Sequence, residues 1–201
     1  MRGTTDLPLE GLVHDLNNVF QTIVESAGVL YQDPKWIKLA ATLQRSADRG
    51  QRLIQSILDQ NRSPAEAADV IDSATRFARD YLECVHGPAL EMAQDVEPGL
   101  RLPGDPAAWE RVLVNLLVNA AEAGAGHVSI TARKRAIVVR DDGPGISPDL
   151  LPHIFQPHVS SKSIMSGLGL YVVQSLVEQH GGTVTAENLA SGGARFKIGL
   201  A

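Results

Sequence analysis

Hydrophobic residues recur at alternating intervals of three and four near the start of the chain, which predicts an amphipathic α-helix from Leu9 to Gln32. Polar positions repeat with the same period on another side of this helix, at His14, Asn18, Gln21 and Glu25. Asp33-Pro34 ends the pattern, because a residue that precedes proline is disfavoured in the helical region. The imidazole of His14 is thus expected to face solvent, a position that suits a chemical role better than a role in core packing.

A second helical pattern with heptad spacing runs from Lys35 to Gln60. Two helices joined by so short a turn lie antiparallel. A hairpin of two helices cannot cover two apolar seams from water, so we expect a homodimer that forms a four-helix bundle. Ser63-Pro64 and the small residues around it place a domain boundary between residues 1–62 and 63–201.

Helical and strand patterns are mixed in the remainder of the chain. We predict helices at 70–82, 106–123, 148–154 and 169–180, and strands at 89–96, 100–102, 127–133, 136–140, 183–187 and 195–200. Asp105 and Pro106 suit the N-cap and the first position of the second of these helices. The pattern predicts an α+β fold, with helices packed on one mostly antiparallel sheet.

Composition excludes several classes of protein. A chain of 201 residues with 44% hydrophobic content is large enough for a real core, whereas a net charge of −5 and 4% aromatic residues argue against a nucleic-acid partner. Cys84 is the single cysteine, so no internal disulfide can form. The sequence shows no signal peptide and no membrane-spanning run, and we expect a cytoplasmic location.

Two asparagines in the predicted helix 106–123 carry unusual chemistry. Asn115 and Asn119 lie four residues apart and share one helical face, while leucines fill the other. Asparagine is a mediocre helix former, and its amide oxygen is a ligand that Mg²⁺ accepts beside water and phosphate oxygens. A structural pair that is hydrogen-bonded to a neighbouring loop is the alternative.

Two glycine-containing stretches follow. Asp141 comes directly after a predicted strand and precedes Gly143 and Gly145, so its carboxylate can accept a hydrogen bond from an exocyclic amine such as that of adenine. Gly167 and Gly169 open the last predicted helix, whose N-terminal N–H groups and macrodipole favour an anion such as phosphate. An ordinary turn and a plain loop are the respective alternatives.

In this order, the stretches resemble the catalytic core of the sensor histidine kinases of two-component systems. Segments similar to the family's phosphoacceptor, asparagine, first glycine, phenylalanine and second glycine boxes lie at 14–18, 115–120, 141–145, 155–157 and 167–170, and segments similar to its last strands at 180–182 and 192–196. The resemblance implies a dimerisation and phosphotransfer hairpin over residues 1–62. It also implies a Bergerat-type α/β-sandwich ATP-binding domain over residues 63–201.

The resemblance implies roles for individual residues. His14 would take the γ-phosphoryl group of ATP and pass it to an aspartate of a response-regulator receiver domain, while Asp15 would hold the other ring nitrogen. Asn18 matches the position that orients a water for dephosphorylation. Asn119 would bind Mg²⁺ with help from Asn115. The remaining nucleotide contacts would come from Asp141, Gly143, Gly145, Lys162, Gly167 and Gly169.

Two positions depart from the family's pattern: Met165 stands where relatives usually have a glycine, and His158 where they have a second aromatic residue. The first alternative is therefore an ATP-independent histidine phosphotransferase, in which a degenerate ATPase domain accompanies the hairpin. Intact Asn119 and Asp141 argue against it. A second alternative is a regulatory binding module of the anti-sigma type, which would leave the His14 stripe without a purpose.

Overall fold

The computed structural model describes residues 6–30, 33–37, 39–41, 43, 44, 46, 47, 50, 64–85, 87–157, 159 and 169–201. The chain forms two compact units, Met1–Asn61 and Arg62–Ala201, which are treated separately below. Of the predicted site residues, Lys162 and Gly167 lie outside the described part of the chain, as do His158 and Met165. None of the helices that are described is long and apolar enough to span a bilayer.

The N-terminal unit begins with the predicted long helix. Helix α1 spans Asp6–Leu30, and a 3-10 turn, η1, spans Pro34–Trp36. Asp33 separates the two because its backbone is extended and its carboxylate accepts a hydrogen bond from Lys35 N at 2.9 Å. The described residues between 37 and 50 continue the second helix, whereas its expected end at 51–60 lies outside the described part.

The two helical segments pack against each other with small residues at the contact. A Cβ on Gly50 would overlap the ring of Phe20, so the two segments approach closely there. Ala27 of α1 and Ala40 and Ala47 of the second segment are buried. Because positions 20 and 50 lie at similar distances from the turn at 33–36, the contact fits the predicted antiparallel hairpin.

A five-stranded mixed sheet forms one layer of the C-terminal unit, in the order β2-β4-β5-β7-β6. Its strands are β2 (Glu91–Val96), β4 (His127–Arg133), β5 (Ala136–Asp141), β6 (Thr183–Asn188) and β7 (Ala194–Gly199). Strand β2 pairs with β4 in parallel, and the other neighbours pair antiparallel. The sheet is therefore not wholly antiparallel, and the parallel pair requires a connection that crosses over the sheet.

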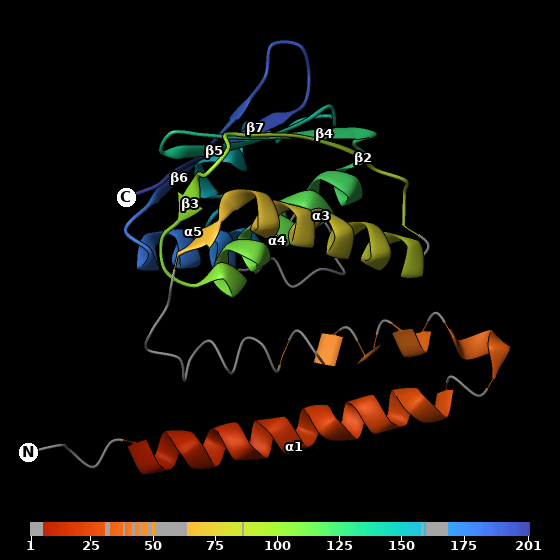
Figure 1. Ribbon diagram of the computed structural model, residues 1–201. Coiled ribbons are helices and arrows are strands. Elements are labelled where there is room, and N and C mark those ends of the chain that lie inside the picture. The colour runs from red at the N-terminus through yellow and green to blue at the C-terminus, as the bar shows by residue number, and fades with distance from the viewer. Residues whose placement is uncertain are drawn as a thin grey trace, which may run out of the picture. The chain divides into compact units, whose positions relative to one another are not determined.

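Three helices form the second layer on one face of this sheet, namely α3 (Ala67–Cys84), α4 (Pro106–Ala123) and α5 (Gly169–Gln179) (Figure 1). Burial alternates along the central strands: Val128 and Ile130 of β4 are buried, whereas Ser129 between them is exposed. This alternation shows that one face of the sheet packs on the helices and that the other is solvated. Most of the hydrophobic core lies between the two layers.

Helix α4 begins and ends where its sequence predicts. The Asp105 carboxylate caps the helix by accepting from Ala107 N at 3.0 Å, and Pro106 occupies its first turn. Gly124, with φ of 93°, terminates it in the left-handed conformation that glycine adopts without strain. The helix that carries Asn115 and Asn119 is thus fixed at both ends.

Two features of the C-terminal unit differ from the predictions. The helix expected at 148–154 is only a 3-10 turn, Leu151–His153, because Pro152 has no N–H to donate. Strand β1 (Ala65–Glu66) was not predicted; it forms a short ribbon by pairing antiparallel with β3 (Arg101–Leu102), which lies within the strand expected at 100–102. This ribbon attaches the first residues of the unit to the segment that precedes α4.

Candidate functional site

Asp141 is the last residue of β5, and backbone groups hold its carboxylate. Its Oδ1 accepts hydrogen bonds from Gly143 N at 3.0 Å and from Ala194 N at 3.2 Å. Among the described residues, none donates a hydrogen bond to Oδ2. The carboxylate is therefore oriented by two amides and offers one oxygen to a donor from outside the chain.

Glycines allow the chain to approach this carboxylate closely. Gly193, with φ of 84°, lies so near the backbone of Asp141 that a Cβ there would overlap the carbonyl oxygen. Gly145 also has a positive φ, of 81°. Both conformations favour glycine, so Gly145 of the first glycine box and Gly193 of the segment 192–196 each have a local structural reason.

The asparagine pair lies beside the start of α5. A Cβ on Gly169 would lie 3.6 Å from Asn119 Oδ1 and 3.8 Å from Asn115 Oδ1. Both asparagines are half-buried, and neither amide makes a hydrogen bond to another residue in the described part of the chain. The structure thus brings three of the predicted site residues together, with amide oxygens next to a helix N-terminus.

The loop after Asp141 lies against the C-terminal end of α4, the helix that carries Asn115 and Asn119. A Cβ on Gly143 would lie 3.6 Å from Ala125 Cβ, and Ala125 comes immediately after Gly124, the C-cap of α4. Asp141 points to the same side of the sheet as the buried Val139, which is the side that the helices cover. The carboxylate and the two amides therefore belong to the same layer interface.

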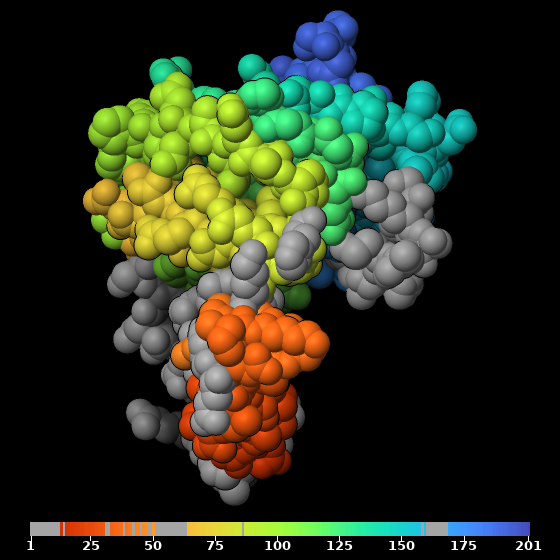
Figure 2. All heavy atoms as spheres, turned by 90° about the vertical axis from the view of Figure 1, so that its right-hand side faces the viewer, coloured from red at the N-terminus to blue at the C-terminus, as the bar shows by residue number. Residues whose placement is uncertain are grey.

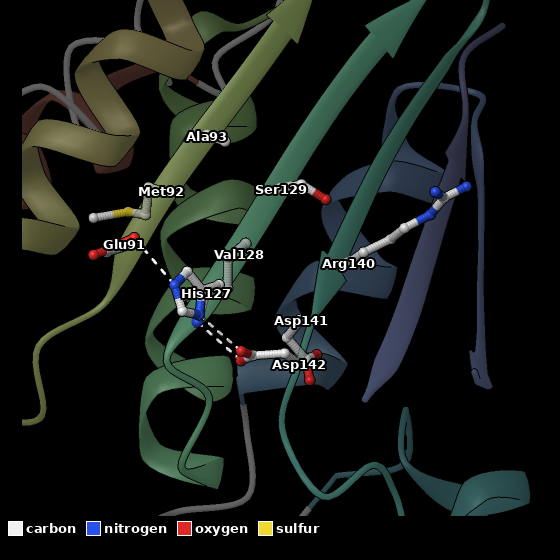
Figure 3. A pocket seen from close by; sticks show the side chains of 9 residues that line it. All are labelled: Glu91, Met92, Ala93, His127, Val128, Ser129, Arg140, Asp141 and Asp142. Carbon is white, nitrogen blue, oxygen red and sulfur yellow. Dashed lines mark hydrogen bonds and ion pairs between the residues drawn. The ribbon is translucent and has the colours of Figure 1, made fainter. Parts of the chain in front are cut away.

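On the solvated face of the sheet, His127 bridges two carboxylates (Figure 3). Its Nδ1 lies 2.8 Å from Asp142 Oδ2, and its Nε2 lies 3.1 Å from Glu91 Oε2. The hydrogen bond to Asp142 and the negative charge of Glu91 raise the pKa of His127. The backbone N–H of His127 and its ring both donate to Asp142 and lower the pKa of that carboxyl.

His180 packs inside the helical layer. Its ring lies 5.3 Å from that of Trp109, its Nε2 accepts from Asp105 N at 3.2 Å, and its Nδ1 donates to Leu176 O at 2.7 Å. His127 is thus a surface residue, and His180 is a packing residue. The described residues contain no cluster of three His, Cys, Asp or Glu side chains that could hold a metal ion.

The predicted phosphoacceptor segment lies in α1. Asp15 and Asn18 are exposed, as are Gln21 and Glu25, whose side chains are hydrogen-bonded to each other at 3.2 Å. The polar stripe predicted from the sequence is thus solvent-facing at its described positions. His14 belongs to the same helix, and its side chain lies outside what the structure describes.

Asn188 is a residue of this site that the sequence did not reveal. Its side chain forms two hydrogen bonds with Ile146, in the loop that begins at Asp141. No motif includes it, because its partners are backbone groups, which leave no pattern in the sequence.

Comparisons with known proteins agree with this geometry. Residues 104–201 match the family described as histidine kinase-, DNA gyrase B-, and HSP90-like ATPase. The sensor histidine kinase ZraS of Klebsiella oxytoca is 31% identical over 206 residues, which cover 94% of this chain and 44% of that protein. The chain spans less than half the length of this curated relative.

Two solved structures share the fold. The mycobacterial sensor histidine kinase MprB superposes with a TM-score of 0.60 at 27% identity, over 69% of this chain and 96% of that one. Full-length ShkA in complex with AMPPNP superposes with a TM-score of 0.62, over 98% of this chain and 47% of that one; at 21% identity this likeness concerns the fold alone. Together these matches show that the chain is similar along most of its length to sensor histidine kinases, and that its residues 104–201 belong to the histidine kinase-, DNA gyrase B-, and HSP90-like ATPase family.

Proposed function

We propose that this chain autophosphorylates on His14 with Mg²⁺ and ATP and then transfers the phosphoryl group to an aspartate of a response-regulator receiver domain. The observation that carries the proposal is the Asp141 carboxylate: two backbone amides hold Oδ1, and no residue in the described part of the chain donates to Oδ2. An adenine amine is a suitable donor, and the asparagine pair at the same layer interface suits the phosphate end of the nucleotide.

In this proposal, the C-terminal unit orients the nucleotide. Asp141 accepts from the adenine amine, while Gly143 and Gly145 leave room for the base. Gly169, at the first position of α5, presents N–H groups to phosphate oxygens. We assign Lys162 and Gly167 to the phosphates as well, on the motif alone.

The chemistry of the donor set fits a magnesium ion. Asn119 and Asn115 provide neutral amide oxygens, a ligand type that Mg²⁺ takes together with water and phosphate oxygens. When bound, the ion would offset the charge that develops on the phosphate oxygens during transfer. We therefore propose Asn119 as the ligand from the protein, with Asn115 beside it.

On α1, the neutral imidazole of His14 would attack the γ-phosphorus, so that an N–P bond forms, the bond to the leaving ADP breaks and the ring gives up a proton. Asp15 would hold the other ring nitrogen and stabilise the charge that forms on the ring. Asn18 would orient a water during later dephosphorylation.

We further propose that residues 1–62 form the dimerisation and phosphotransfer hairpin and that residues 63–201 form the ATP-binding domain. Leu16 and Val19 of α1 belong to the predicted apolar seam, yet in the single chain they are 37% and 54% exposed. A second copy of the hairpin would cover them in a four-helix bundle. Because the reaction consumes ATP, we propose a cytoplasmic location.

Labelling with γ-³²P ATP and Mg²⁺ tests the proposed function. We expect the chain to acquire an acid-labile, base-stable label, and we expect His14→Ala to abolish it because no other nucleophile replaces the imidazole. Gln21→Ala, on the same polar stripe, is the matched control and should label normally.

The transfer step needs a second assay with a phosphorylatable receiver domain. Labelled protein should lose its phosphoryl group to the receiver. A chain that binds no nucleotide at millimolar ATP but takes phosphoryl groups from a phosphorylated receiver would instead be the ATP-independent phosphotransferase.

A further inference from the structure

Asn188, the last residue of β6, holds a loop that lies 42 positions earlier in the chain. Its Oδ1 accepts from Ile146 N at 2.7 Å, and its Nδ2 donates to Ile146 O at 2.7 Å. Both polar backbone atoms of one residue are thus bound by one side-chain amide. Two hydrogen bonds of opposite polarity fix the position and the rotation of that peptide segment.

The loop held in this way begins at Asp141. Between Asp141 and Ile146 lie Gly143 and Gly145, and glycines provide little conformational restraint of their own. Gly145 lies directly against the Asn188 side chain, since a Cβ there would lie 2.8 Å from Asn188 Oδ1. The Asn188 amide therefore supplies restraint that the glycines lack.

The same hairpin also holds the start of the loop. Asn188 is the ladder partner of Ala194 in the antiparallel pairing of β6 with β7, and Ala194 N donates to Asp141 Oδ1. The paired residues Ala194 and Asn188 thus hold the loop at Asp141 and at Ile146, respectively. In Figure 1 the tip of this hairpin is the blue loop that projects from the sheet away from the helices. In Figure 2 it is the blue group of atoms at the top.

We propose that Asn188 is a positioning residue for adenine recognition: it fixes the loop 141–146 on the β6–β7 hairpin so that Oδ2 of Asp141 faces the exocyclic amine. This inference rests on the proposed function, in which Asp141 reads adenine. Asn188 itself makes no contact with the nucleotide in this proposal. Its loss should therefore weaken the recognition of the amine more than the binding of the rest of the nucleotide.

The test compares the affinities of the full chain for ADP and for purine riboside 5′-diphosphate, which lacks the amine, by calorimetry with Mg²⁺. ADP cannot phosphorylate the protein, so the titration measures binding alone. A hydrogen bond to a charged group predicts that the wild-type chain prefers ADP by about 10-fold to 100-fold. We expect Asn188→Ala to reduce this preference to about 3-fold or less, mainly through weaker ADP binding.

Two further variants separate positioning from general damage. Thr185→Ala changes an exposed residue on the same strand and should keep the wild-type preference. Asn188→Asp is isosteric and keeps an acceptor for Ile146 N, but it has no N–H for Ile146 O, so we expect an intermediate preference. Thermal unfolding of each variant shows that the chain is folded during the titration.

The outcomes distinguish this inference from the proposed function. A wild-type preference for ADP that persists in folded Asn188→Ala or Asn188→Asp overturns the positioning role and leaves the proposed function standing. A wild-type chain that binds neither nucleotide, or binds both equally, overturns adenine recognition by Asp141 and this inference together.

Discussion

At the scale of single residues, the cluster of His127, Glu91 and Asp142 makes stability depend on pH. The pKa of His127 is raised above its ordinary value of 6.5, so the folded chain binds this proton more tightly than the unfolded chain. The contribution is fully present below about pH 6.5 and is lost as the pH rises through the raised pKa. Asp142, whose pKa is lowered, stays ionised throughout this range.

We therefore expect His127→Gln to lower the melting temperature more at pH 6 than at pH 9. The effect should be small, because the His127 side chain is 67% exposed and its ion pairs are screened by solvent. Thermal unfolding of both proteins across this range measures it. His153→Gln is the control, since His153 contacts the Gln156 amide rather than a carboxylate. An equal or larger difference at pH 9 would contradict the assignment.

Candidate site residues that belong to a motif could be proposed from the sequence, whereas residues that act through backbone contacts could not. Asp141 and Asn119 belong to ordered stretches with a recognisable spacing, and the structure places them at one layer interface. Asn188 bonds the peptide groups of Ile146, and any residue in that place would offer the same two groups. Only coordinates reveal such a contact.

At the scale of elements, His180 joins the end of α5 to the start of α4. Its Nε2 accepts from the backbone N–H of the buried cap residue Asp105, and its ring packs against Trp109. Because Gly169 at the other end of α5 lies beside Asn119, this contact helps to hold both helices in the register that the candidate site needs.

We expect His180→Ala to destabilise the fold by about 1–3 kcal/mol, because it leaves a buried N–H without its acceptor. The melting temperature should fall by several degrees, at about 2–4 °C per kcal/mol for a chain of this size. Thermal unfolding followed by circular dichroism measures the change. Gln179→Ala, at the exposed neighbouring position, should have little effect; an equal loss in both variants would argue against the contact.

Elements with local signals could be predicted closely, and elements that depend on distant partners could not. The bounds of α4 follow from Asp105, Pro106 and Gly124, all of which act within one turn. The two residues of β1 form a strand only because β3 lies beside them, some 35 positions later. The prediction of a helix at 148–154 was wrong because it gave too little weight to Pro152.

At the scale of the whole molecule, we expect nucleotide chemistry and dimer formation to be separable. Asn119→Ala removes the proposed magnesium ligand without touching the hairpin, so labelling from ATP should be lost while the mass in solution stays that of a dimer. Retention of radioactive label measures the first property, and light scattering on the same samples measures the second. Ser129→Ala, on the solvated face of the sheet, should keep both, and dissociation of Asn119→Ala into monomers would contradict the proposed division of labour.

The sequence predicted the α+β class but not how its strands are ordered. Alternating patterns show which side of a strand is buried, and they say nothing about which strand lies beside it. The parallel pairing of β2 with β4 follows from the crossover through α4, which places the asparagines over the sheet. Strand order was therefore learned from the structure alone.

The ribbon of β1 and β3 helps to decide at which residue a recombinant fragment of the C-terminal unit should begin. The family match begins at residue 104, yet Ile71, Ala74 and Ala78 of α3 are completely buried in the core shared with α4. A truncation at residue 104 would remove α3, which packs against α4, the helix that carries Asn115 and Asn119. The shortest piece worth expressing alone starts near Pro64, whose carbonyl is bound by the Arg101 guanidinium.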